Sequence, residues 1–92
     1  MDLGIAGRVA LVTASSKGLG RGAAEALARE GVSVVINGRS PEVLAETESA
    51  LREAGADVLA IPGDVTEPGA PAELVAATIE WKGRIDILVP NA

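Results

Sequence analysis

The sequence lacks cysteine and histidine altogether, and Trp81 is the one aromatic residue among its 92 residues. Without cysteine the chain can form neither a disulfide framework nor a thiolate metal site. Without histidine it lacks the commonest metal ligand and general base, and we expect no metal site. Because phenylalanine and tyrosine are absent too, the core must consist of valine, leucine, isoleucine and alanine, which suits buried parallel strands covered by helices.

Positive charge is also scarce, since eight Lys and Arg residues against thirteen Asp and Glu give a formal net charge of −5. The chain has no basic stripe and no aromatic stacking platform, so we expect no nucleic-acid partner. No apolar run approaches the roughly 18 residues of a membrane span, and the opening MDLGIAGR has no basic segment followed by a long apolar core. We therefore expect one cytoplasmic domain over residues 1–92, without a membrane partner.

What the chain does have is a regular alternation of apolar strands and amphipathic helices. Apolar and β-branched runs predict strands, and Ser40 with Pro41 predicts a helix start that is matched by a stop at Gly55. The predicted strands are 9–13, 32–37, 57–61 and 85–89, and the predicted helices are 19–30, 41–54 and 71–82. This order implies an α/β fold with a parallel sheet and right-handed crossovers.

Three details of this scheme concern packing. Trp81, near the end of the third helix, is expected to cover part of the core. Asp86 falls inside the fourth predicted strand, and we interpret it as a strand-entry residue near solvent. The first helix is expected to place four apolar residues on one face: Leu19, Ala23, Ala26 and Leu27.

The stretch TASSKGLG, residues 13–20, follows the first strand and opens onto the first helix. A Gly-rich turn at a helix N-terminus is an anion site, because the first amides have no partner within the helix and the helix dipole favours negative charge. Gly18 and Gly20 would let the backbone approach a pyrophosphate and let the helix pack closely on the strand. A tight turn without a ligand is the alternative. The GK[ST] ending of a P-loop is absent.

Two cations near this turn favour a phosphate-bearing ligand. Arg39 follows the second strand, where an acidic residue would bind ribose hydroxyls and an Arg suits a 2′-phosphate. Lys17 lies within the Gly-rich turn itself. In an acidic protein, two cations that converge on one point indicate a bound phosphate, with a solvated loop charge as the alternative for each. The missing acid also argues against S-adenosylmethionine.

Together these motifs resemble the short-chain dehydrogenase/reductase family. Thr13-Ala14-Ser15-Ser16-Lys17-Gly18-Leu19-Gly20 is similar to its TGxxxGxG signature, and Asp64-Val65 stands after the third strand, where the family has an Asp that contacts the adenine. Pro90-Asn91-Ala92 is similar to the start of its NNAG motif. The whole chain resembles the N-terminal part of family members, and it looks closest to bacterial 3-oxoacyl-carrier-protein reductases, which act in fatty acid biosynthesis.

The resemblance implies the N-terminal half of a Rossmann-type doubly wound sheet, with strand order 3-2-1-4. It implies NADP(H) as cofactor, a small-molecule carbonyl or alcohol as substrate, hydride transfer as the reaction, and a homo-oligomer, dimeric or tetrameric. It also implies a set of cofactor-binding residues: Thr13, Ala14, Ser15, Ser16, Lys17, Gly18, Leu19, Gly20, Arg39, Asp64, Val65 and Asn91. The residue-level alternative for Asp64 is a turn residue before Thr66.

Three departures from the family pattern qualify this expectation. Ala14 replaces the first signature glycine and disfavours a positive φ, and Pro90 replaces an asparagine and removes an amide. The family's catalytic Ser, Tyr and Lys lie beyond residue 92, and this chain has no tyrosine. We therefore expect no catalytic residue here and no activity from the 92 residues alone. The alternatives are a non-catalytic truncated nucleotide-binding fragment and a structural remnant that binds nothing.

Overall fold

The computed structural model describes residues 7–15 and 18–91, and within them strands and helices alternate as the sequence predicts. The elements are β1 (Val9–Val12), α1 (Gly18–Arg29), β2 (Ser33–Gly38), α2 (Pro41–Glu53), β3 (Val58–Pro62), α3 (Ala70–Lys82) and β4 (Ile87–Val89). Each predicted element is confirmed, and no end differs from its predicted position by more than two residues. Among the described residues, no helix is both long and apolar enough to cross a bilayer.

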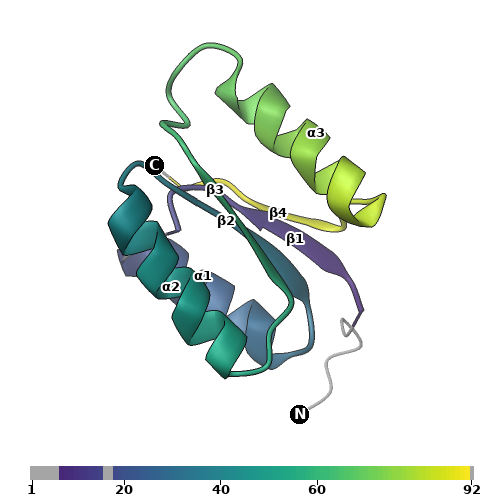
Figure 1. The fold of residues 1–92 in the computed structure, drawn as a ribbon. Coiled ribbons are helices and arrows are strands. Elements are labelled where there is room, and N and C mark those ends of the chain that lie inside the picture. The colour runs from purple at the N-terminus through teal and green to yellow at the C-terminus, as the bar shows by residue number, and fades with distance from the viewer. Residues whose placement is uncertain (1–6, 16–17, 92) are drawn as a thin grey trace.

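The four strands form one parallel sheet in the order β3-β2-β1-β4, which confirms the predicted topology. Helices α1 and α2 lie on one face of the sheet and α3 lies on the other, so the sheet is wound on both sides (Figure 1). All four strands run the same way, and their carboxyl ends therefore meet along one edge. In register, Leu11 of the central strand β1 stands between Val35 of β2 and Leu88 of β4.

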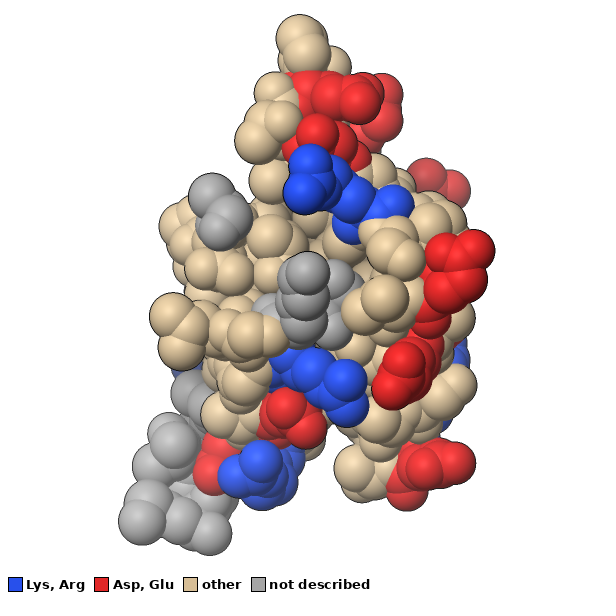
Figure 2. Space-filling view, turned by 90° about the vertical axis from the view of Figure 1, so that its left-hand side faces the viewer, with Lys and Arg blue, Asp and Glu red and all other residues tan. Residues whose placement is uncertain are grey.

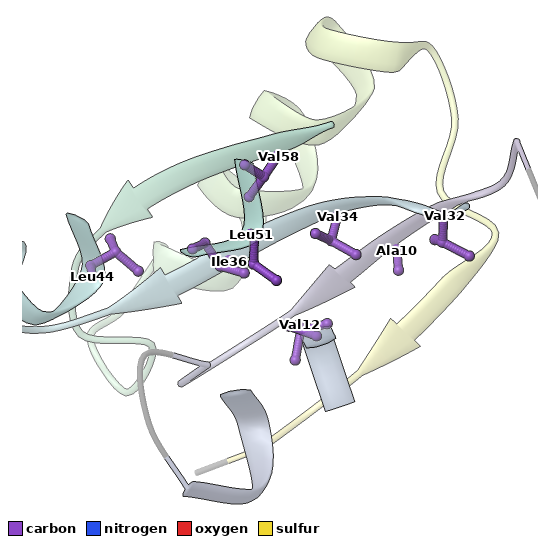
Figure 3. Packing of buried hydrophobic residues seen from close by; sticks show 9 residues of the cluster. Ala10, Val12, Val32, Val34, Ile36, Leu44, Leu51 and Val58 are labelled. Carbon is purple, nitrogen blue, oxygen red and sulfur yellow. The ribbon is translucent and has the colours of Figure 1, made fainter. Parts of the chain in front are cut away.

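Side chains that alternate along the two central strands build two apolar clusters, one on each face of the sheet. The larger cluster lies under α1 and α2 and includes Val12, Ile36, Leu44 and Leu51, all at most 3% exposed (Figure 3). The smaller cluster lies under α3 and consists of Leu11, Val35 and Leu74, with Trp81 packed against it. The prediction that Trp81 covers part of the core is thus confirmed.

The apolar face predicted for α1 is partly wrong. Leu19 is 88% exposed and Ala26 is exposed, whereas Gly20 and Ala24 are the buried residues of this helix. Ala23 and Leu27 do pack against the larger cluster, together with Ala28. The helix therefore approaches the sheet closely through Gly20 and Ala24, and Leu19 is left exposed.

Asp86 lies directly before β4, which confirms the interpretation as a strand-entry residue and corrects its placement inside the predicted strand. Its backbone amide donates to the Val9 carbonyl at 2.8 Å, and its carboxylate accepts from the Val9 amide at 2.8 Å. Arg84 donates to both carboxylate oxygens, at 2.7 and 2.9 Å. With its side chain only 13% exposed, Asp86 joins the starts of β1 and β4 instead of facing solvent.

This carboxylate gives the fold a defined sensitivity to acid. Hydrogen bonds from Arg84 and from the Val9 amide hold the pKa of Asp86 below its usual value of 3.8. A carboxyl group with a depressed folded-state pKa stabilises the fold above its unfolded-state pKa, and this stabilisation is lost as the pH falls. We expect the free energy of unfolding, measured by denaturant titration, to drop below about pH 4. Asp86→Asn should flatten that drop.

The control for this prediction is Glu53→Gln, which removes one negative charge at an exposed position of α2. The control variant should keep the acid dependence of the unaltered protein. An Asp86→Asn profile that follows the unaltered protein between about pH 2 and pH 5 would show that other carboxylates carry the effect.

Candidate functional site

A cavity of about 610 Å³ opens at the carboxyl-end edge of the sheet, between the turn after β1 and the loops after β2 and β3. Seven of the predicted site residues line it: Ala14, Gly18, Leu19, Arg39, Asp64, Val65 and Asn91. Six other residues complete the lining: Asn37, Gly38, Ser40, Val43, Gly63 and Thr66. Motifs that lie up to 77 residues apart in the sequence therefore meet around one space.

The turn after β1 holds Ala14 in the left-handed region, with φ of 49°. Its carbonyl accepts from the Asn91 side chain at 3.1 Å, and its amide donates to the Asn37 side chain at 3.1 Å. The sequence identified the strain that Ala14 would meet there. The structure shows that the turn is built with alanine nonetheless, because hydrogen bonds on both sides of the residue hold it.

Gly20 is where α1 comes closest to this turn. A Cβ atom at this position would stand 2.3 Å from the Ala14 carbonyl oxygen and 2.9 Å from the Ser15 Cα. Gly18, at the start of α1, has a φ of 63°, and it faces open space. The close packing that the signature predicts is seen at Gly20, and Gly18 adds a backbone conformation that side chains disfavour, while the approach to a pyrophosphate stays a prediction.

Three further predicted residues support the turn, and two cannot be placed. The Thr13 hydroxyl donates to the Asn91 carbonyl at 3.1 Å and accepts from the Asn91 amide at 2.9 Å, so it ties β4 to the turn. Ser15 is fully buried, and its amide donates to the Asn37 carbonyl at 2.6 Å. Gly20 lies behind the cavity wall. Ser16 and Lys17 lie outside the described residues.

Arg39 and Asp64 face one another across the mouth of the cavity, with 3.9 Å between a guanidinium nitrogen and a carboxylate oxygen. The Arg39 side chain is 80% exposed and free to reorient, while that of Asp64 is 28% exposed. The second Asp64 oxygen accepts from the Thr66 hydroxyl at 2.6 Å and from its amide at 2.9 Å. These bonds from Thr66, with the nearby charge of Arg39, lower the pKa of Asp64.

The interpretation of Asp64 as a turn residue is confirmed, and its place in the cavity lining leaves the predicted adenine contact possible in geometry. One carboxylate oxygen closes the turn to Thr66, and the other points toward Arg39 at the cavity. Such a division keeps the carboxylate ionised and oriented at neutral pH. It can accept a hydrogen bond from a ligand amino group without giving up its structural role.

Asn37 is a cavity-lining residue that the sequence analysis did not single out. It is 2% exposed, it lies next to the last residue of β2, and its side chain bridges the turn after β1 to the loop after β3. A polar residue at the end of an apolar strand is the one sequence signal that could have drawn attention to it.

Charge on the molecular surface is uneven around these elements. In Figure 2, acidic side chains follow one side of the visible face, and the few basic side chains form small separate groups. Within residues 7–15 and 18–91, Arg39 is the basic residue that lines the cavity. In a chain of net charge −5, this guanidinium is the cationic group that the described residues offer to a phosphate at the cavity mouth.

These features fit a dinucleotide. A Gly-rich turn and a helix N-terminus suit a pyrophosphate, and the helix packs so closely that a Cβ at Gly20 would collide with the turn. The cavity lies outside the carboxyl ends of parallel strands, which is where open α/β sheets bind ligands. The fold and the site together define a dinucleotide-binding α/β protein of the Rossmann type.

Comparison with known proteins then gives the family. The sequence profile of the family described as short chain dehydrogenase matches residues 8–92, which is nearly the whole chain. The chain belongs to the short-chain dehydrogenase/reductase family, as its TASSKGLG signature predicted.

Individual relatives agree in sequence and structure. The rhamnolipids biosynthesis 3-oxoacyl-[acyl-carrier-protein] reductase of Pseudomonas aeruginosa is 41% identical over 88 residues, which are 96% of this chain and 34% of the relative. L-Sorbose reductase from Gluconobacter frateurii, solved with NADPH and L-sorbose, superposes with a TM-score of 0.94 and 40% identity over 100% of this chain and 35% of its own.

A third relative carries the other nicotinamide cofactor. A short-chain dehydrogenase/reductase from Burkholderia phymatum, solved in complex with NAD, superposes with a TM-score of 0.87 and 33% identity over 91% of this chain and 30% of its own. The chain thus spans about a third of the length of the relatives that it matches. Because both cofactors occur among these structures, family membership supports a nicotinamide dinucleotide without choosing between them.

Proposed function

We propose that the protein binds NADP(H) in the cavity at the carboxyl ends of β1, β2 and β3, as the cofactor half of an oxidoreductase that interconverts carbonyl and alcohol groups. The observation that carries the choice of NADP(H) is Arg39, an exposed guanidinium at the cavity mouth directly after β2. No acidic residue stands beside it in the sequence to bind ribose hydroxyls, and an Arg at this place suits a 2′-phosphate.

In this proposal each wall of the cavity has its own task. The backbone amides of residues 15–20, at the start of α1, receive the pyrophosphate. Lys17 and Arg39 hold the 2′-phosphate, and Asp64 with Val65 borders the adenine. Asn91, at the end of β4, lies toward the nicotinamide ribose. The cofactor supplies the hydride, and the protein supplies position and charge.

The substrate class is a further proposal. Relatives include a 3-oxoacyl-carrier-protein reductase and an L-sorbose reductase, and both act on carbonyl groups. We propose a small carbonyl or alcohol substrate for this protein, with 3-oxoacyl groups as the first candidates. Residues 1–92 form one cofactor domain in this proposal, of a cytoplasmic homo-oligomeric enzyme.

The second candidate is nucleotide binding without turnover, and a specific observation favours it. The 92 residues contain no tyrosine and no histidine, so they offer neither the proton donor of the family nor the commonest general acid. The intact mass of the purified protein separates the two functions. A mass near 9.2 kDa is compatible with nucleotide binding only. The reductase requires a mass more than twice as large.

Replacement of Arg39 tests the cofactor choice. Because a hydrogen bond to a charged group is among the stronger polar contacts, Arg39→Ala should weaken NADPH binding roughly 10- to 100-fold. NADH binding should change by less than about twofold, since NADH carries no 2′-phosphate for the guanidinium to lose. Calorimetric titration of the purified protein with each nucleotide measures both constants.

Arg29→Ala is the matched control, because it removes an equal charge from the exposed far end of α1. This control should leave both affinities as they are. If the two variants weaken NADPH binding equally, Arg39 contributes only to the net charge of the protein and makes no specific contact with the 2′-phosphate. An unaltered protein that binds NADH more tightly than NADPH would overturn the choice of NADP(H).

A further inference from the structure

Ala14 occupies a backbone conformation that a residue with a Cβ seldom adopts, and two side chains hold it there. Its φ of 49° lies in the left-handed region, which non-glycine residues enter mainly where the surrounding structure over-determines them. Asn37 Oδ1 accepts from the Ala14 amide at 3.1 Å, and Asn91 Nδ2 donates to the Ala14 carbonyl at 3.1 Å. Both polar groups of the strained residue are therefore fixed.

Asn37 does more than hold Ala14. Its Nδ2 group donates to the carbonyls of Ile61 and Gly63, each at 3.1 Å, so the carboxamide is hydrogen-bonded on every side. Its backbone is held as well, because the Asn37 amide donates to Ser15 Oγ at 2.8 Å and its carbonyl accepts from the Ser15 amide at 2.6 Å. One buried residue thus joins the turn after β1 to the loop after β3.

These two segments are opposite walls of the cavity. Ala14 and Gly18 belong to the wall beside α1, and Gly63, Asp64 and Val65 belong to the wall beyond β3. A ligand that touches both walls is bound well only when their separation is fixed beforehand, because the cost of ordering them is otherwise taken from its affinity. Asn37, 2% exposed between the walls, is placed to set that separation.

We propose that Asn37 is a positioning residue for the cofactor, and that the protein depends on it because alanine occupies position 14. Glycine reaches a left-handed φ without help, whereas Ala14 requires the hydrogen bond from its amide to Asn37. The turn keeps the shape that receives a pyrophosphate only while this bond is made. The proposal rests on the function proposed above for the same cavity.

A double-mutant cycle tests the dependence. Asn37→Ala should weaken NADPH binding at least tenfold, and the affinity measured for Ala14→Gly is the reference for the double variant. In the double variant Ala14→Gly with Asn37→Ala, at least half of the loss should be recovered on a logarithmic scale. Calorimetric titration of the four proteins gives the constants, and a loss in the double variant as large as in Asn37→Ala overturns the proposal.

The variant Thr78→Val tests whether loss of stability alone weakens NADPH binding, because it removes another fully buried polar group. Thr78 donates to the Leu74 carbonyl at 2.7 Å within α3, apart from the cavity. This variant should be less stable but should bind NADPH with unchanged affinity. If it weakens binding as much as Asn37→Ala does, binding follows stability and the positioning role is refuted.

Denaturant unfolding of the same four proteins tests this inference independently of nucleotide binding. If the unaltered protein binds neither NADPH nor NADH, the proposed function fails, and the unfolding midpoints of the four proteins then decide the inference. Asn37→Ala must lower the unfolding midpoint less when residue 14 is glycine, and an equal drop in both backgrounds overturns the inference. Should Asn37→Ala not fold, Asn37→Ser takes its place in the cycle.

Discussion

Gly20→Ala is expected to abolish measurable nucleotide binding and to lower the melting temperature. The added Cβ would stand 2.3 Å from the Ala14 carbonyl oxygen and 2.8 Å from the Asn91 side-chain nitrogen. The carbonyl belongs to the backbone, which cannot swing aside, so α1 must move away from the turn. Such overpacking costs about 1–3 kcal/mol, which lowers the melting temperature of a domain this small by roughly 5–15 °C.

Gly22→Ala is the matched control in the same helix. A Cβ at Gly22 would meet nothing within 4 Å, and alanine is the better helix former by about 0.5–1 kcal/mol. This variant should melt at the same temperature or slightly higher and bind nucleotide normally. Calorimetry gives both readouts. A Gly20→Ala protein that binds NADPH like the control would mean that α1 can shift without loss of the site.

Leu11→Ala should produce the largest loss of stability available in the smaller cluster. Leu11 is 1% exposed at the centre of β1 and packs with Val35 and Leu74. Truncation of a buried leucine to alanine costs roughly 2–5 kcal/mol through lost burial and the cavity that remains. Since small proteins are stable by only about 5–15 kcal/mol, denaturant titration should show a large part of the total stability gone.

Leu88 supplies the control, because it stands directly opposite Leu11 in the sheet register. It belongs to the edge strand β4 and is 57% exposed, so Leu88→Ala should cost less than about 1 kcal/mol. Equal losses for Leu11→Ala and Leu88→Ala would contradict the burial argument.

The sequence predicted the fold well because its signals are local and repeated. Short apolar runs such as 9–13 and 32–37, rich in β-branched residues, favour buried strands. Ser40 with Pro41 marks a helix start that the structure confirms, since Ser40 Oγ accepts from the Val43 amide at 3.4 Å. The strand order came from the family resemblance, which the comparisons confirm. Seven predicted residues meet at one cavity because each follows the carboxyl end of a strand.

The sequence-based errors concern residues whose position in the folded structure does not follow from the pattern of their neighbours in the sequence. Leu19 was assigned to an apolar face because leucine usually marks one, yet α1 packs through Gly20 and Ala24, which carry little hydrophobic contrast. Asp86 was assigned to a strand because its neighbours are apolar. Asn37 was missed because its partners, Ala14, Ile61 and Gly63, are backbone groups brought together only by the finished sheet.

The central position of β1 affects how the protein is made. β1 pairs with β2, which follows soon after it in the chain, and with β4, which comes almost at the end of the 92 residues. At the usual synthesis rate of about 5–20 residues per second, the stretch between Gly38 and Ile87 takes roughly 2–10 s to emerge. During that interval the far edge of a fully apolar strand has no neighbour of its own, and this is when a nascent chain is most exposed to wrong pairing and to capture by chaperones.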